Sequence, residues 1–446
     1  MTETLETRFA SEMGRLLGPD FPSEIGLAVS GGGDSMAMLA LAHGWARVFG
    51  IRLWVVTIDH GLRADSASEA EMVARECALL GHSHAILRWH WSGQGNVMDA
   101  ARRARLRLID GWRGRLVHVA MAHTRDDLAE TFLMRLARGA GVDGLAAMKS
   151  ARRIVPEAGG TAEPRQAGWP PEVPAPGSAF TLIRPCLGMG REELRHYNRT
   201  LKVPWVDDPT NADPDYERAR IRAALPAVAE AGIDVAALAD AANRLGRARE
   251  ALKRRASEAA ERISSAPTSQ GVPTGELHFD RDSFAALDRE TQARLLVGAL
   301  RWVAGGDYKP RAAPLEALLD RLLSGGGGTL AGCEAGCDRS ALWVAREPAA
   351  VKGLSAAAGA LWDGRWRLSG SAAEGLEVRA LGEEGWQQVP EKPADVPPHR
   401  RARALPALWD GDRLVASVHL GVGPGHDVEI LPRRGANRFA DFLLSD

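Results

Sequence analysis

Short apolar runs and amphipathic segments alternate through the first half of the chain. The apolar runs have the length and the β-branched content of buried strands, and they are 25–29, 53–59, 84–89, 116–121 and 181–187. The amphipathic segments have the periodicity of helices, and they are 36–41, 66–80, 98–112 and 191–202. This alternation predicts an α/β fold, a doubly wound, Rossmann-like parallel sheet with right-handed crossovers. Ligands of such sheets bind beyond the carboxyl ends of the strands.

A glycine-rich turn joins the first predicted strand to the first helix. Its sequence is Ser30-Gly31-Gly32-Gly33-Asp34-Ser35. Glycines allow positive φ and close approach of backbone N–H groups to an anion, and the N-terminus of the following helix adds its positive dipole end. Neither a Walker loop, which needs Gly-Lys-Ser/Thr, nor a dinucleotide fingerprint fits this turn. A turn without a ligand is disfavoured, because three adjacent glycines weaken packing unless something occupies the space.

The pattern Ser-Gly-Gly-x-Asp-Ser resembles the loop of the PP-loop ATP pyrophosphatase superfamily, whose members cleave ATP between the α- and β-phosphates. Pyrophosphate is the leaving group in that chemistry. The backbone amides and the hydroxyls of Ser30 and Ser35 are suited to hold it, and Asp34 is suited to hold the Mg²⁺ that neutralises it.

A second polar cluster follows the fourth predicted strand. His123, Asp127 and Glu130 have the spacing i, i+4 and i+7, which predicts one shared helical face. The opposite, core-facing side of this helix is expected to contain Leu128, Phe132 and Leu136. Two acids and a histidine opposite a phosphate loop can hold a metal or a cationic substrate. A solvated helix start, where acids favour the helix dipole, remains an alternative.

Together with further motifs, these residues resemble the tRNA(Ile)-lysidine synthetase family, in that family's order and over about residues 24–226. The motifs are 30–35, 59–63, Arg102 and Arg105, 123–131, Arg138-Gly139, Arg184-Pro185, 208–211, and the spaced arginines Arg218, Arg220 and Arg222. The chain departs from the family pattern at Thr124, Cys186 and Ala219.

The resemblance implies a two-step ligase. ATP adenylates the C2 oxygen of the wobble cytidine in the isoleucine tRNA with the anticodon CAU, and the ε-amine of free lysine then displaces AMP to give lysidine. The implied catalytic residues are Asp34, Asp127, Glu130, Arg184, Arg218 and Arg220. The implied ATP-binding residues are Ser30, Gly31, Gly32, Gly33, Asp34, Ser35, Asp59, His60 and His123, with Asp34 also the Mg²⁺ ligand.

The length of 446 residues predicts several domains. We expect a catalytic domain over 1–225, a mostly helical tRNA-binding domain over 226–346, and a small α+β domain over 347–446. Residues 156–178 are rich in Pro, Gly, Glu and Ala and predict a mobile surface insertion. A basic ridge in the middle domain fits either a tRNA surface or a solvated helix face, and contains Arg244, Arg247, Arg249, Lys253, Arg254 and Arg255.

Composition indicates the cellular location of the protein. The four cysteines, the absence of a signal-like start and the lack of an apolar run of roughly 18 residues predict a cytoplasmic protein without a membrane segment. The net charge of −1 leaves tRNA binding open, because a neutral total can hide a basic face. A tRNA thiolase with the same ATP chemistry is the main alternative, although the chain has no Cys-x-x-Cys; a non-catalytic ATP-binding module is the second. Monomer and homodimer both remain open.

Overall fold

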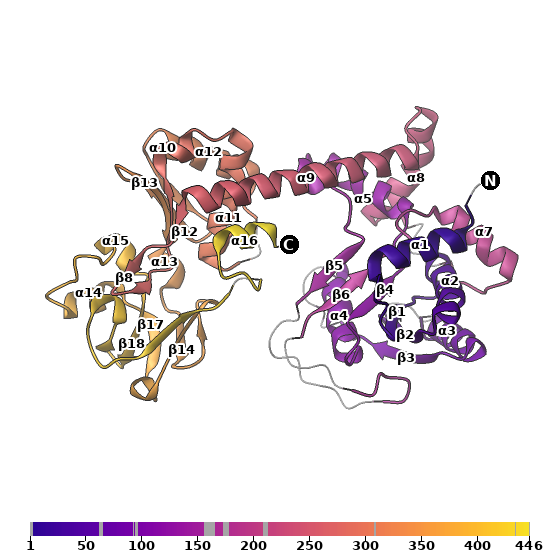
Figure 1. Ribbon diagram of the computed structural model, residues 1–446, viewed down its shortest axis with the longest axis horizontal. Helices are drawn as coiled ribbons and strands as arrows, with labels where there is room; N and C mark the ends of the chain where they lie inside the picture. The colour runs from indigo at the N-terminus through magenta and orange to yellow at the C-terminus, as the bar shows by residue number, and fades with distance from the viewer. Residues whose placement is uncertain are drawn as a thin grey trace. The chain divides into compact units, whose positions relative to one another are not determined.

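The computed structural model describes residues 3–61, 66–91, 93, 97–155, 166–172, 178–207, 213–306, 309–432 and 434–445. The chain divides into two compact units, 1–249 and 250–446 (Figure 1). The domain limits predicted at 225 and 346 stay predictions, and the first of them falls inside helix α8 (Glu217–Glu230).

A six-stranded sheet forms the centre of the first unit, in the order β3-β2-β1-β4-β6-β5. Its strands are β1 (Glu24–Ala28), β2 (Arg52–Asp59), β3 (Ser83–Arg88), β4 (His118–Met121), β5 (Ala151–Ile154) and β6 (Phe180–Ile183). All neighbouring pairs are parallel except β5 and β6. The predicted doubly wound sheet is confirmed, and the antiparallel edge strand β5 is an addition to it.

Helices cover both faces of this sheet (Figure 1). The helices α1 (Leu5–Leu17), α2 (Gly33–Phe49), α3 (Ser66–Leu80) and α7 (Arg191–Leu201) share one core with the sheet, whereas α4 (Val97–Trp112) packs on the other face. In β2, Leu53 and Val55 enter the first core and Trp54 and Val56 the second, as the two-residue period of a strand requires. Both faces are apolar because both are buried.

The described part of the predicted insertion is packed against the sheet. Trp169 is buried in the same core as Trp54 and Trp112, so the expectation that this segment buries too little surface to fold is wrong for 166–172. Gly168 has φ +82, and a Cβ there would clash with the carbonyl oxygen of His84. The expectation of mobility for 156–165 and 173–177 lies outside the described residues.

Further helices complete the first unit. They are α5 (Arg125–Ala137), α6 (Val142–Leu145), α8 and the first half of α9 (Val235–Ile263). Ala129 and Phe132 of α5 pack on Leu238 and Ala242 of α9. Leu136, predicted to be a core contact, is 50% exposed, because the apolar contact of α5 with α9 extends only to Leu133.

The second unit contains several antiparallel sheets. A five-stranded sheet, β11-β12-β13-β10-β7, packs with α10 (Arg281–Ala285), α11 (Arg289–Ala304) and α12 (Ala312–Leu323). Its strands are β7 (Ser264–Ser265), β10 (Leu277–Asp280), β11 (Gly328–Leu330), β12 (Cys333–Cys337) and β13 (Ala341–Arg346). The segment predicted to be mostly helical therefore also contains a sheet.

The region 347–446, for which a small α+β domain is predicted, contains most of the remaining strands and helices. Its sheets are β14-β17-β18-β19 and β15-β16-β20. Its strands are β14 (Ser355–Ala357), β15 (Leu361–Trp362), β16 (Trp366–Ser369), β17 (Glu377–Ala380), β18 (Pro406–Asp410), β19 (Arg413–Ala416) and β20 (Asp427–Ile430). Its helices include α13 (Pro348–Val351), α14 (Gly382–Gln388) and α15 (His399–Ala402), while a short hairpin, β8 (Thr268–Ser269) and β9 (Val272–Pro273), belongs to the preceding segment. The last helix, α16 (Phe439–Leu444), returns to the core around α11.

No helix in the described residues combines the length and apolar character needed to cross a membrane.

We predict that Gly168→Ala destabilises the first unit by about 1–3 kcal/mol, because alanine is strained at positive φ and its Cβ would strike the His84 carbonyl. Gly44→Ala is the matched control, since Gly44 lies in α2, its added methyl would meet no atom within 4 Å, and alanine favours helices. Thermal unfolding measures both. Equal midpoints for Gly168→Ala and the unsubstituted protein would mean that 166–172 do not pack on the sheet.

Candidate active site

Four of the predicted motifs meet at the carboxyl edge of the sheet. The glycine loop follows β1, Asp59 and His60 end β2, His123 follows β4, and Arg184 follows β6. Strands β1 and β4 are neighbours, and the connections from them lead to opposite halves of the sheet. This is the topological switch point at which open α/β sheets form their ligand crevice.

The glycine loop is held from behind by α7 and the residues after it. Gly31 has φ +89, and its carbonyl accepts a hydrogen bond of 3.0 Å from the backbone N–H of Val206. The side-chain amide of Asn198 donates to the Gly33 carbonyl at 2.8 Å. Because these carbonyls are bonded to the scaffold, the loop is fixed in shape before any ligand arrives.

The two serines of the loop bond to the loop itself. The Ser35 hydroxyl donates to the Gly32 carbonyl at 2.8 Å and accepts from the Ser30 backbone N–H at 3.2 Å. Ser35 is buried and Ser30 is exposed. In this structure Ser35 therefore braces the turn, and Ser30 is the hydroxyl that a ligand can reach.

Asp34 lies in the first turn of α2, and its two oxygens differ. Oδ2 lies 3.4 Å from Nε of Arg191, whereas Oδ1 is buried and has no hydrogen-bond partner among the described residues. Burial, together with the charge of Asp127, raises the pKa of Asp34 to about 6 against the opposing charge of Arg191. A buried carboxylate oxygen without a donor is suited to a cation.

The fourth strand leads into α5 through a capping box. Thr124 is the N-cap, its backbone N–H donates to Asp127 Oδ2 at 2.8 Å, and its hydroxyl contacts the same oxygen at 3.2 Å. The prediction that His123 shares a helical face with Asp127 and Glu130 is wrong, because the cap at Thr124 leaves His123 outside the helix. His123 nevertheless stays close to Asp127, whose charge acts to raise the pKa of the imidazole against the effect of burial.

Glu130 is fully buried and accepts hydrogen bonds from arginines of two helices. Oε1 accepts from Arg191 Nη1 and from Arg222 Nε, both at 2.9 Å, and Oε2 accepts from Arg218 Nε at 2.6 Å. Burial alone would raise the pKa of Glu130, but these donors and their charges lower it to about 2. Glu130 is therefore an ionised anchor for the arginines.

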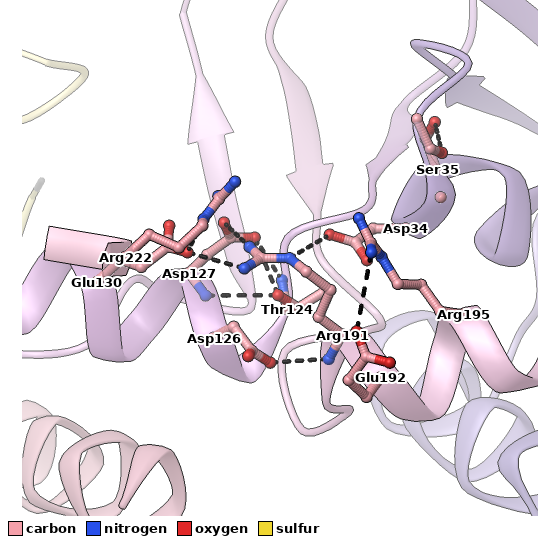
Figure 2. Close-up of polar contacts among 12 residues, drawn as sticks. Asp34, Ser35, Thr124, Asp126, Asp127, Glu130, Arg191, Glu192, Arg195 and Arg222 are labelled. Carbon is pink, nitrogen blue, oxygen red and sulfur yellow. Dashed lines mark hydrogen bonds and ion pairs between the residues drawn. The ribbon is translucent and has the colours of Figure 1, made fainter. Parts of the chain in front are cut away.

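Arg191 links all three carboxylates, as Figure 2 shows. Besides its contact with Glu130, Nε lies 3.4 Å from Asp34 Oδ2 and Nη2 lies 3.5 Å from Asp127 Oδ1. Burial lowers the pKa of Arg191, but the three carboxylates outweigh it and raise that pKa. One guanidinium thus spans the distance between the glycine loop and α5.

We call Asp34, Asp127, Glu130, Arg191, Arg218 and Arg222 the acid–arginine cluster. Arg218 completes it, because its Nη2 donates to Asp127 Oδ1 at 2.7 Å. When all six are ionised, the three negative charges balance the three positive ones. Neutral pairing is what permits so many charges to be partly buried at one place.

The side chains of three predicted nucleotide-binding residues are either neutral or already hydrogen-bonded to the protein. These residues are Asp59, His60 and His123. Burial raises the pKa of Asp59, but hydrogen bonds from Ser66 and Gly61 bring it below its ordinary value. Burial and nearby arginines lower the pKa values of both His60 and His123 to about 4. Both imidazoles are neutral at pH 7 and can only donate or accept hydrogen bonds.

The structure separates the other two predicted arginines from the acids. Arg184 is buried, donates to the Lys149 carbonyl at 2.6 Å, and has a pKa lowered to about 10 by burial and by Arg152 and Arg102. Arg220 is exposed and donates to the Pro214 and Asp215 carbonyls. The structure thus brings Arg218 to the acids but not Arg220. Arg63 and 208–211 lie outside the described residues.

Comparisons with known proteins show which family the chain resembles. Residues 5–228 match the PP-loop domain family. A tRNA(Ile)-lysidine synthase of Ruegeria pomeroyi is 39% identical over 430 residues, which cover 95% of this chain and 94% of that protein. A tRNA(Ile)-lysidine synthase of a Bradyrhizobium species is 40% identical over 325 residues, which cover 70% of this chain and 83% of that protein.

The chain belongs to the tRNA(Ile)-lysidine synthase family. The resemblance seen in the motifs is thereby confirmed, and the glycine loop is that of an ATP-using PP-loop domain. Among solved structures, a U34-tRNA thiolase of Methanococcus maripaludis is 15% identical, with a TM-score of 0.39 over 54% of this chain and 78% of that one. A similarity of this size supports no functional conclusion.

Arg191 is the residue of this lysidine synthase family member that the sequence motifs missed. Only its helix was predicted. A signal was available, because an arginine in the first turn of a helix opposes the helix dipole and needs a nearby acid. Asp126 is one such acid at this helix start, where its carboxylate accepts the Arg191 backbone N–H at 2.8 Å.

We predict that Glu130→Gln lowers the free energy of unfolding by about 3 kcal/mol at pH 7, because it removes one partner of a buried ionic network. The folded-state pKa of about 2 lies below the ordinary 4.5, so the stabilisation is present above pH 4.5 and is lost as the pH falls towards 2.

Urea unfolding of both proteins at pH 7, 4.5 and 3 measures this difference. Glu12→Gln is the control, because Glu12 forms an exposed pair with Arg15 and such pairs contribute little. A difference that stays constant down to pH 3 would show that the charge of Glu130 does not stabilise the fold.

Proposed function

We propose that this protein ligates lysine to C2 of the wobble cytidine of the CAU-anticodon isoleucine tRNA, through an adenylated cytidine, to give lysidine. One observation carries the proposal. The phosphate loop with Asp34 and the acids of α5 share a single site, in which the Arg191 guanidinium reaches Asp34 at 3.4 Å and Asp127 at 3.5 Å. The phosphate loop, which is suited to an anion, and Asp127, which is suited to a cation, are thus connected by the side chain of Arg191.

In the first step, the cytidine O2 attacks the α-phosphorus of ATP and pyrophosphate leaves. The first-turn amides of α2 and the Ser30 hydroxyl are placed to hold the departing phosphates. Arg218, which is 45% exposed, can balance charge on the α-phosphate, and Arg184 remains charged at pH 7. His60 and His123, both neutral, are suited to the adenosine part of the nucleotide.

Mg²⁺ fits Asp34. Magnesium ions in nucleotide sites are often held by one or two carboxylates together with phosphate oxygens, so a single aspartate is sufficient. The unpartnered Oδ1 supplies such a ligand. When bound, Mg²⁺ would neutralise the pyrophosphate charge.

In the second step, the lysine ε-amine forms a bond to C2, the C2–O bond breaks, and AMP leaves with the former cytidine oxygen. Lysine arrives as an ammonium ion and must lose a proton before it attacks. Asp127 is the acid to receive the ammonium group and its proton, because Glu130 is fully buried behind three arginines. Glu130 acts as a positioning residue.

The rest of the chain is proposed to hold tRNA while the wobble base leaves its stack and enters the site. Arg247 and Arg254 of α9 are exposed and suited to phosphate contacts, whereas Arg255 is paired with Asp288 at 3.0 Å. We place this reaction in the cytoplasm, where tRNA and reduced cysteines coexist.

The thiolase alternative is opposed by the state of the cysteines. Thiol chemistry requires an accessible thiolate. Burial raises the pKa of Cys77 to about 12 and raises that of Cys186 further, and both side chains are buried. Neither cysteine is suited to carry sulfur.

We predict that incubation with labelled lysine, ATP and total tRNA transfers label to one isoleucine tRNA. Liquid chromatography and mass spectrometry of the digested tRNA locate the label in the wobble nucleoside. Dependence of the product on sulfide in place of lysine would favour the thiolase.

Asp34→Asn should abolish tRNA-dependent pyrophosphate release while leaving the fold intact, because it removes the cation-binding charge without changing volume. Pyrophosphate release and circular dichroism test the two parts. Normal turnover would exclude Asp34 as the Mg²⁺ ligand.

Tight tRNA binding should weaken steeply with salt, and Arg247→Gln combined with Arg254→Gln should reduce the log–log slope by about one for each arginine that contacts a phosphate. The matched control is Arg47→Gln with Arg75→Gln, which removes the same charge from exposed positions of α2 and α3. If both double variants reduce the log–log slope by the same amount, α9 has no specific part in tRNA binding.

A further inference from the structure

We infer that Arg191 is a built-in counter-ion that occupies the ammonium position at Asp127 until lysine displaces it. This inference rests on the proposed function, because it concerns how lysine enters the site. It adds a competitor for the lysine position that none of the sequence motifs indicates.

The contacts of Arg191 are unequal. Its bond to the buried Glu130 is 2.9 Å long, whereas its contacts to Asp34 and Asp127 are 3.4 and 3.5 Å. Short charge-assisted bonds are the strong ones. Arg191 is therefore held firmly by the acid that no ligand can reach, and loosely by the two that a ligand needs. Its backbone N–H is fixed by Asp126, so that the side chain alone would move.

The charge balance gives the reason for displacement. The acid–arginine cluster has no net charge, so an incoming ammonium gains little attraction while all three arginines keep their places. If Arg191 withdraws from Asp127, that acid still has Arg218 and the Thr124 cap, and Glu130 still has Arg218 and Arg222. Arg191, whose contact with Asp127 is 3.5 Å against 2.7 Å for Arg218, can thus leave Asp127 without stranding a buried charge.

Arg222 provides a matched comparison. Like Arg191, it donates to Glu130 Oε1 at 2.9 Å, but its only carboxylate partner among the described residues is Glu130. Replacing either arginine removes one charge from the same carboxylate oxygen. Of these two arginines, only Arg191 also contacts the carboxylates of Asp34 and Asp127.

The experiment is calorimetric titration of L-lysine into the full-length protein saturated with a non-hydrolysable ATP analogue. Arg191→Gln should bind lysine about five-fold more tightly or better, the effect of one unit charge about 4 Å away at the dielectric of water. Arg191→Lys, which keeps the charge, should stay within about two-fold of the unsubstituted protein. Arg222→Gln removes an equal charge but no contact at Asp127, so it should tighten lysine binding less than Arg191→Gln does. In steady-state assays Arg191→Gln should lower both the KM for lysine and kcat. The lower KM is the distinguishing result, because loss of a purely structural residue would not lower it.

Lysine binding by Arg191→Gln that is unchanged or weaker would overturn the inference while leaving the proposed function in place. Absence of lysine binding and of lysidine formation in the unsubstituted protein would overturn both. If Arg191→Gln does not fold, a crystal structure of the unsubstituted protein with lysine decides. The inference requires a lysine nitrogen on Asp127 Oδ1 with Arg191 Nη2 displaced from it, and Arg191 still in place beside a lysine bound elsewhere would contradict it.

Discussion

A fully buried carboxylate, Glu130, determines how the catalytic unit is assembled. An ionised group without solvent must be paired, and its partners come from α7 and α8, at positions 61 to 92 residues further along the chain. Those helices must therefore pack beside α5. Once they do, α7 also places Asn198 behind the glycine loop. The same pairing that satisfies Glu130 thus fixes the shape of the phosphate cradle.

A site whose charges already cancel suits a reaction with two oppositely charged ligands. In the proposed reaction, ATP brings negative charge to the glycine loop, and lysine brings positive charge to Asp127. Each ligand can exchange with an internal ion pair instead of entering a strongly charged cavity, which keeps the cost of moving charges out of water small. Arg191 and Arg218 both contact Asp127.

Local patterns in the sequence were sufficient for the sheet, the glycine loop and the acids of α5. They were insufficient where capping or long-range pairing decides. Helix α5 begins after the Thr124 cap, so His123 lies outside it. In α8, a two-residue spacing puts Arg220 on a different face from Arg218 and Arg222, which are four apart. That second outcome follows once α8 is known to be a helix.

The partners of Arg191 and the packing of Trp169 were beyond local patterns. Arg191 meets Asp34 across 157 residues, and no periodicity encodes such a contact. Trp169 lies in a segment whose composition indicates disorder, yet one buried indole and a close glycine contact hold its described part on the sheet. Composition describes a segment's average, whereas packing depends on a single side chain.

A single site that adenylates the cytidine O2 and then delivers lysine to the same carbon must transfer the cytidine oxygen to AMP. Isoleucine tRNA carrying ¹⁸O at C2 of the wobble cytidine makes this transfer visible by mass spectrometry. We expect the AMP released on addition of lysine to carry one ¹⁸O, in an amount equal to the lysidine formed. Lysidine formation with unlabelled AMP, or labelled AMP released without lysine, would contradict this mechanism.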